Sequence, residues 1–136
     1  MPSSFVTPLR IEPVDQLTSS VPMWRLLEGF QFDIGFKGSG NYVRVEEGFE
    51  TDFASSPRAT WSIIPPWGKY GKGAVIHDKL CDDRKIMTAE YGEIIISRKM
   101  CDDIFLDCMI VLGVPEKERN LIYSAVRAYA IAKGIH

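Results

Sequence analysis

Four ionisable side chains stand out because their types and spacing could support acid–base or metal chemistry. His77 and Asp78 are neighbours that directly follow the apolar run Ala74-Val75-Ile76, while Asp52 lies in TDFASSPR and Asp102 lies in SRKMCDDIF. An imidazole held by a carboxylate has a fixed tautomer and a stabilised cation, so it can take a proton from water. We therefore predict that His77 is a general base and that Asp102 orients it.

The neighbouring Asp78 is a candidate metal ligand. Adjacent residues on a helix point about 100° apart, so His77 and Asp78 cannot both be centred on one cleft. With His77 in the cleft, Asp78 would lie at its margin and could bind Ca²⁺ or another divalent cation with Asp52 nearby, since hard cations prefer oxygen ligands. Structural interpretations stay open beside this one: His77 as a satisfied core histidine, Asp78 as a turn cap or ion-pair partner, and Asp52 as a turn former.

The elements that must position these residues change type along the chain. Residues 23–50 alternate apolar with polar or small side chains around the turn-like GFKGSGN, which is typical of antiparallel strands and a hairpin. Residues 84–96 fit either a strand or the approach to a helix. Residues 1–22 are rich in Ser, Thr and Pro and are expected to form an extended arm, with one domain over residues 23–136.

The second half of the chain favours helices. The apolar spacing predicts one from Ala74 to about Asp83, and Ser97 is a suitable N-cap for another over 98–112. A last helix is expected between Pro115 and Gly134, with Arg127 bridging to a carboxylate such as Asp52. The predicted class is α+β, with an N-terminal antiparallel hairpin or meander followed by a bundle of about three helices.

Composition limits the function classes. The chain has 136 residues, 46% of them hydrophobic and 25% charged, with a net charge of -2. This balance excludes a broad basic face for nucleic acid. We find no apolar run of the roughly 18 residues that a membrane span needs. The beginning MPSSFVTPLRIEP lacks the order of a secretory signal.

The three cysteines, Cys81, Cys101 and Cys108, cannot all pair within the chain. Their odd number favours a reducing compartment or buried thiols. Cys101 and Cys108 fall on the apolar stripe of the predicted second helix, which favours buried free thiols. His77-x3-Cys81 lacks the close cysteine pair of common zinc sites.

Several ordered motifs together resemble one protein family. TDFASSPR, HDKL, SRKMCDDIF and YSAVRAY are similar to a phage and prophage group catalogued as domain of unknown function family 1353. The resemblance spans roughly residues 24–134. It implies a phage-linked origin, with the protein in the host cytoplasm during infection or associated with the virion, and it implies no activity.

A shorter resemblance suggests a reaction. A His-Asp pair on one helix and an Asp on the next is similar to phospholipase A2-type sites, although the Cys of HDKLC falls one place late and no Tyr follows it. This resemblance implies that His77 activates water, Asp78 binds Ca²⁺ and Asp102 holds the histidine.

Two hypotheses from different classes remain. In the first the protein is a small cation-assisted hydrolase that acts on a lipid ester or another bond of the cell envelope. In the second it is a non-catalytic tail, baseplate or neck component that contacts other phage structural proteins, and the His/Asp set is a hydrogen-bond network. An accessory role during infection is a third alternative. An imidazole open to a cleft favours the hydrolase, and a buried one favours the structural component.

Overall fold

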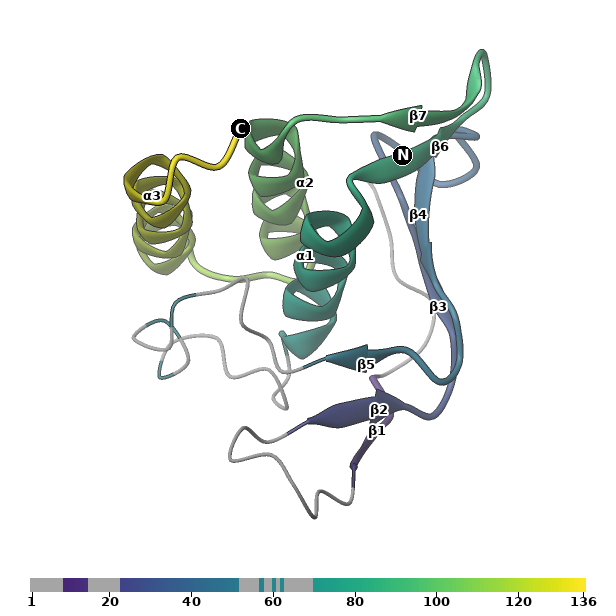
Figure 1. Cartoon of the computed structure of the whole chain (residues 1–136), viewed down its shortest axis with the longest axis horizontal. Helices are drawn as coiled ribbons and strands as arrows, with labels where there is room; N and C mark the ends of the chain where they lie inside the picture. Colours follow the sequence, from purple (N-terminus) through teal and green to yellow (C-terminus); the bar gives the residue numbers. More distant parts are fainter. Residues whose placement is uncertain (1–8, 15–22, 52–56, 58–59, 61, 63–69) are drawn as a thin grey trace.

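The structure, a computed structural model, describes residues 9–14, 23–51, 57, 60, 62 and 70–136. Two antiparallel sheets and three helices make up this part of the chain (Figure 1). The elements in chain order are β1 (Ile11–Pro13), β2 (Trp24–Leu26), β3 (Phe30–Asp33), β4 (Tyr42–Val45), β5 (Glu50–Thr51), α1 (Gly71–Asp83), β6 (Lys85–Thr88), β7 (Gly92–Ile95), α2 (Arg98–Val111) and α3 (Glu116–Ala132). The predicted α+β class is confirmed.

The smaller sheet has the strand order β1-β2-β5. Its first strand falls inside the segment 1–22 that was expected to be an arm, and Ile11 pairs with Leu26 of β2. Apart from residues 9–14, that segment lies outside the described residues. The division between an arm and a domain at residue 22 therefore stays a prediction. Thr51 ends β5 and is buried against the rest of the molecule.

The larger sheet has the order β3-β4-β6-β7. The predicted hairpin joins β3 to β4, and its turn uses Gly35, Gly38 and Gly40 at positive φ, where glycine avoids the strain of a side chain. Alternate residues of both strands face the core, as the period of two requires. The buried set is Phe30, Phe32, Val43 and Val45.

The ambiguous segment 84–96 forms the β6–β7 hairpin, which stands between α1 and α2 in the chain (Figure 1). Arg84 ends α1 in the left-handed conformation, with φ at 59°. This hairpin buries Ile86 and then Ile96 before α2 begins. The strands therefore do not all precede the helices, because a second hairpin completes the larger sheet after α1.

The helix α1 begins at Gly71, three residues before the predicted start. Gly73 lies in its first turn, where a Cβ atom would lie 3.3 Å from Leu112 Cδ1 and 3.5 Å from the Cβ of Cys108. The missing side chain lets α1 pack tightly on α2. The predicted cap of α2 is present, since the Ser97 hydroxyl accepts a hydrogen bond from the Met100 backbone N–H.

The helix α2 stands between α1 and α3 and therefore belongs to both halves of the core (Figure 1). One apolar cluster joins the strands to α1 and to Cys101, Ile104 and Cys108 of α2. A second cluster joins Phe105 and Met109 to α3. Among the described residues, no helix combines the length and apolar character that crossing a membrane would require.

Candidate functional site

The structure brings His77 of α1 and Asp102 of α2 together. His77 Nε2 lies 2.6 Å from Asp102 Oδ1, and both side chains are completely buried, with 0% exposure. The two residues belong to the faces on which α1 and α2 pack, so the helix contact itself sets this distance. An acid from one segment thus holds the imidazole of another.

Two arginines share the same carboxylate. Arg98 Nε donates to Asp102 Oδ1 at 2.9 Å from one turn earlier on α2, and Arg127 Nη1 of α3 donates to Oδ2 at 2.7 Å. Arg98 is itself buried and Arg127 is mostly buried. We refer to His77, Arg98, Asp102 and Arg127 as the Asp102 network. It ties all three helices together through one carboxylate.

The sequence analysis missed the role of Arg98 and gave Arg127 a different partner. The spacing of four residues from Arg98 to Asp102 is a signal that the sequence did contain, because residues i and i+4 are neighbours on a helix. No such signal exists for Arg127, which reaches Asp102 from a separate helix. The Asp52 expected to pair with Arg127 lies outside the described residues.

The His77 ring does not meet solvent, which is the condition that the hydrolase hypothesis requires; its burial agrees with the alternative interpretation as a core histidine. The ring has no exposed surface, and it stacks on Phe105 with the ring centroids 4.4 Å apart. Its Nε2 is already engaged by Asp102. A general base must reach the proton that it abstracts within about 3 Å or through one water, and this ring has no surface at which to do so.

In the Asp102 network, charge pairing affects the pKa values of His77 and Asp102 more strongly than burial does. Burial disfavours the charged ring, but the hydrogen bonds to Asp102 and Cys81 leave the pKa of His77 raised above its ordinary value of 6.5. Burial also disfavours the Asp102 carboxylate, yet the hydrogen bonds from His77 and Arg98 hold the pKa of Asp102 below 3.8. The network therefore favours the charged forms of both partners.

Asp78, the neighbour of His77 on α1, contacts the smaller sheet. Its Oδ2 accepts a hydrogen bond from the hydroxyl of Thr51 on β5. Asp78 borders a cavity of about 390 Å³ between the smaller sheet and the helices, which we call the helix cavity. Its lining includes Phe49, Thr51, Asp78, Cys81, Arg98 and Tyr129. The partly exposed Cys81 stands between this cavity and His77, with its sulfur 3.5 Å from Nε2.

The groups around His77, Cys81 and Asp102 decide whether this cluster could hold a metal ion. In the described part of the chain, His77, Cys81 and Asp102 offer ligand atoms within 4.8 Å of one another. A cation there would have to compete with two guanidinium groups for the Asp102 carboxylate. The side chains present do not fit a metal at this position. The divalent cation predicted at Asp78 and Asp52 stays a prediction, since Asp52 lies outside the described residues.

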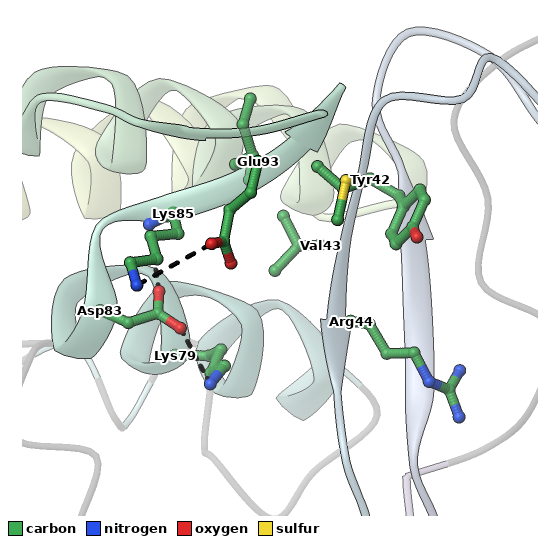
Figure 2. Close-up of a pocket in the computed structure, with 9 residues that line it drawn as sticks. Tyr42, Val43, Arg44, Lys79, Asp83, Lys85 and Glu93 are labelled. Carbon is green, nitrogen blue, oxygen red and sulfur yellow. Dashed lines mark hydrogen bonds and ion pairs between the residues drawn. The ribbon is translucent and has the colours of Figure 1, made fainter. Parts of the chain in front are cut away.

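A second cavity of about 170 Å³, which we call the strand hollow, opens between β4 and β6. The two strands pair at Tyr42 and Met87 alone, so they diverge beyond this point. Figure 2 shows Lys79 and Asp83 of α1 at this opening, with Lys85 and Glu93 of the β6–β7 hairpin beside them. His77, Asp78 and Asp102, the predicted site residues that the structure describes, are not among its lining residues.

Comparison with known proteins gives one match. Residues 24–126 match the model of a family described as "Protein of unknown function (DUF1353)". No curated protein and no solved structure matches the chain.

Proposed function

The chain belongs to the DUF1353 family of proteins of unknown function, and we propose that it is a non-catalytic component of a phage or prophage particle. In this role the His/Asp set holds the fold together. The tail, baseplate or neck is the part of the particle in which the protein would act. It would be made in the host cytoplasm during infection and then assembled with other phage structural proteins.

The single observation that carries this proposal is the burial of the Asp102 network. Both partners of the His77–Asp102 hydrogen bond have 0% exposure, and Arg98 is 3% exposed. Buried charges are tolerated where each has a partner, and removing one partner leaves the others uncompensated. A network of this kind fixes how three helices are arranged, which is the property that a rigid assembly component requires.

The phage association rests on the ordered motifs noted in the sequence, including TDFASSPR and YSAVRAY. The surfaces we expect to contact other particle proteins are the Pro-rich segment 1–22 and the aromatic segment SIIPPWGKY. Aromatic side chains suit this purpose, because they bury large areas on contact and are enriched at interfaces.

The test is the presence of the chain in purified particles. Phage that encodes this chain should be purified on a density gradient, and its protein content measured by mass spectrometry. We expect the chain at a fixed ratio to a known structural protein across the particle peak. Its absence from intact particles, with abundant protein left in the lysate, would contradict the proposal.

The helix cavity favours one second candidate, the cation-assisted hydrolase. Asp78 lines this cavity together with Cys81 and Arg98. In this alternative Asp78 and Asp52 hold Ca²⁺, and the helices separate to let His77 reach water beside a lipid ester.

The two candidates differ in their response to His77→Phe, which keeps a ring against Phe105. Purified protein should be incubated with phospholipid vesicles and Ca²⁺, and the release of fatty acid measured. For the structural component we expect no release from the wild type. Calcium-dependent release that His77→Phe abolishes and Asp103→Asn retains would favour the hydrolase, provided that circular dichroism shows both variants folded.

A further inference from the structure

The strand β7 lies at an edge of the larger sheet. The sheet order β3-β4-β6-β7 places β6 on one side of it, and within the described residues no strand pairs with its other side. Figure 1 shows β7 at the margin of the sheet, directly before α2 in the chain. An unpaired edge presents backbone N–H and C=O groups to which another strand can bind.

The register of the β6–β7 hairpin shows which backbone groups point outward. The Ile96 N–H donates to the Arg84 oxygen at 2.7 Å, so these two residues form a hydrogen-bonded pair. Such pairs alternate with non-bonded pairs along an antiparallel ladder, which makes Ile94 the next residue of β7 that bonds to β6. The N–H and C=O groups of Glu93 and Ile95 therefore point away from β6, toward the outer edge.

The side chains on this edge also suit a contact with another strand. Ile95 is 78% exposed and Tyr91, in the turn before β7, is 73% exposed, and these are the two most exposed large hydrophobic side chains among the described residues. The carboxylate of Glu93 lies 3.9 Å from the Nζ of Lys85 on β6, so its charge is compensated within the same chain. The edge therefore offers an apolar side chain and no uncompensated charge.

The opposite edge of the larger sheet, at β3, differs. The Ile34 N–H donates to the Asn41 oxygen, so by the same alternation Gln31 and Asp33 direct their backbone groups outward. Their side chains bond to each other, with Gln31 Nε2 2.7 Å from Asp33 Oδ1. Polar and charged side chains are a common protection of sheet edges. The β3 edge thus carries a polar pair where the β7 edge carries the exposed Ile95.

We propose that β7 is the docking edge for a second copy of this chain, with the two β7 strands paired antiparallel about a two-fold axis. The larger sheets of the two copies then form one continuous sheet. A second copy is favoured because a two-fold axis brings the same exposed isoleucine and the same compensated carboxylate to both sides of the contact. A head-to-tail contact of β7 with β3 would instead place two acidic residues, Glu93 and Asp33, on adjacent strands.

One register suits this contact best. With Ile94 at the two-fold axis, Glu93 of each copy lies opposite Ile95 of the other, and the outward N–H and C=O groups of both residues find partners. Moving the axis to Glu93 would put two carboxylates directly opposite each other, which is unfavourable. Moving it to Ile95 would pair Glu93 with Ser97, the cap of α2, where the strand has ended. The contact is short, so we expect a weak and reversible dimer.

This inference does not rest on the proposed function, since it uses only the edge of the larger sheet. The segments expected to contact other particle proteins, 1–22 and SIIPPWGKY, are separate from β7 in the sequence. The dimer and the particle role are therefore tested by different experiments.

The test measures the mass of the folded, full-length chain in solution. Sedimentation equilibrium should be run at concentrations that extend into the high-micromolar range. We expect the weight-average mass to rise from the monomer value of 15.4 kDa toward twice that value. A monomer at every concentration would overturn the proposal and would leave a strand of another protein as the candidate for this edge.

Ile95→Pro separates the docking edge from the fold. Proline lacks the N–H that the second copy would bind, and this group makes no bond to β6. The variant should be a monomer where the wild type is a dimer, with an unchanged circular dichroism spectrum. The matched control is Gln31→Pro, which removes an outward N–H at the β3 edge and should dimerise as the wild type does. A dimer that survives Ile95→Pro, or that a folded Gln31→Pro also loses, would overturn the assignment to β7.

Amide hydrogen exchange in the wild type decides the question even where a proline variant does not fold. NMR spectroscopy resolves individual amides in a chain of this size. As the concentration rises from monomer to dimer, the exchange of the Glu93 and Ile95 amides should slow by about tenfold or more. The Ile94 amide is the internal control, because it is bonded to β6 in both states. Unchanged exchange at Glu93 and Ile95 in the dimer would place the contact elsewhere and overturn the proposal.

Discussion

Two groups of charged side chains in this molecule have similar distances and very different surroundings. In the Asp102 network the donor–acceptor distances run from 2.6 to 2.9 Å, and the carboxylate is completely buried. At the strand hollow, Lys79 lies 2.9 Å from Asp83, but more than a quarter of each side chain is exposed (Figure 2). Lys85 and Glu93 there are 3.9 Å apart and about half exposed.

We expect burial, more than distance, to decide what each of these charge pairs contributes to the free energy of unfolding. An exposed pair exchanges good hydration for a weak attraction, and its net contribution is about 0 to 1 kcal/mol. A buried pair has already lost its hydration, so deleting one partner leaves a charge that nothing compensates, at a cost of about 3 to 5 kcal/mol.

Asp102→Asn should be the most damaging of these changes. It leaves His77, Arg98 and Arg127 without their shared carboxylate, and we expect the free energy of unfolding to fall by about 3 to 5 kcal/mol. Urea denaturation followed by circular dichroism measures this loss. The matched control is Asp103→Asn, because Asp103 is the next residue on α2 and bonds to Lys99 and Tyr123 nearer the surface. Equal losses for both variants would contradict the distinction by burial.

His77→Phe should cost less, about 1 to 3 kcal/mol. The new ring keeps the contact with Phe105, and Asp102 keeps both arginines. The same urea experiment measures the difference. A loss as large as that of Asp102→Asn would mean that the imidazole, not the carboxylate, is the centre of the network.

The pH dependence of stability should show two limbs. Because the pKa of His77 is raised by folding, its contribution is complete below pH 6.5 and is lost as the pH rises through the higher folded pKa. Because the pKa of Asp102 is lowered, its contribution is complete above pH 3.8 and is lost as the pH falls through the lower folded pKa. Each limb changes the free energy of unfolding by about 1.4 kcal/mol per unit of pKa shift. Urea titrations at several pH values measure both limbs. We expect the alkaline loss of stability in the wild type and not in His77→Phe. An identical alkaline loss in both proteins would mean that a group other than His77 causes it.

Lys85→Met at the strand hollow should have the smallest effect, below about 0.5 kcal/mol. The lysine is about half exposed and its partner Glu93 is 3.9 Å away. Thermal unfolding at low and high salt measures both the pair and its screening. A fall in the free energy of unfolding of more than about 2 kcal/mol would contradict the comparison. It would mean that the exposed pair at the strand hollow stabilises the fold about as much as a buried pair in the Asp102 network.

The sequence predicted the parts of this structure that depend on local patterns. The α+β class, the glycine-rich hairpin and the Ser97 cap follow from residue periodicity and turn chemistry, and these were found as expected. The hairpin over residues 85–95 was ambiguous because three successive isoleucines suit a strand and a helix equally.

The site was predicted less completely than the fold. The pairing of His77 with Asp102 could be inferred, because two adjacent helices can bring such residues together. The burial of the pair could not, since it depends on how the Phe105 ring of α2 stacks on His77 of α1 and on how α3 packs against α2. Periodicity identifies which face of a helix is covered, but the depth of a particular ring follows from tertiary packing.

The glycine at position 73 has a consequence for the whole helical half of the molecule. One added methyl group there would lie 3.3 Å from the end of the Leu112 side chain, which would have to give by a few tenths of an ångström, and His77 lies about one helical turn further along α1. A hydrogen bond tolerates an extension of only a few tenths of an ångström before it weakens. A position that carries no functional group can therefore influence the alignment of a fully buried polar contact. Where the Leu112 side chain does not yield, a shift of α1 would lengthen the His77–Asp102 hydrogen bond.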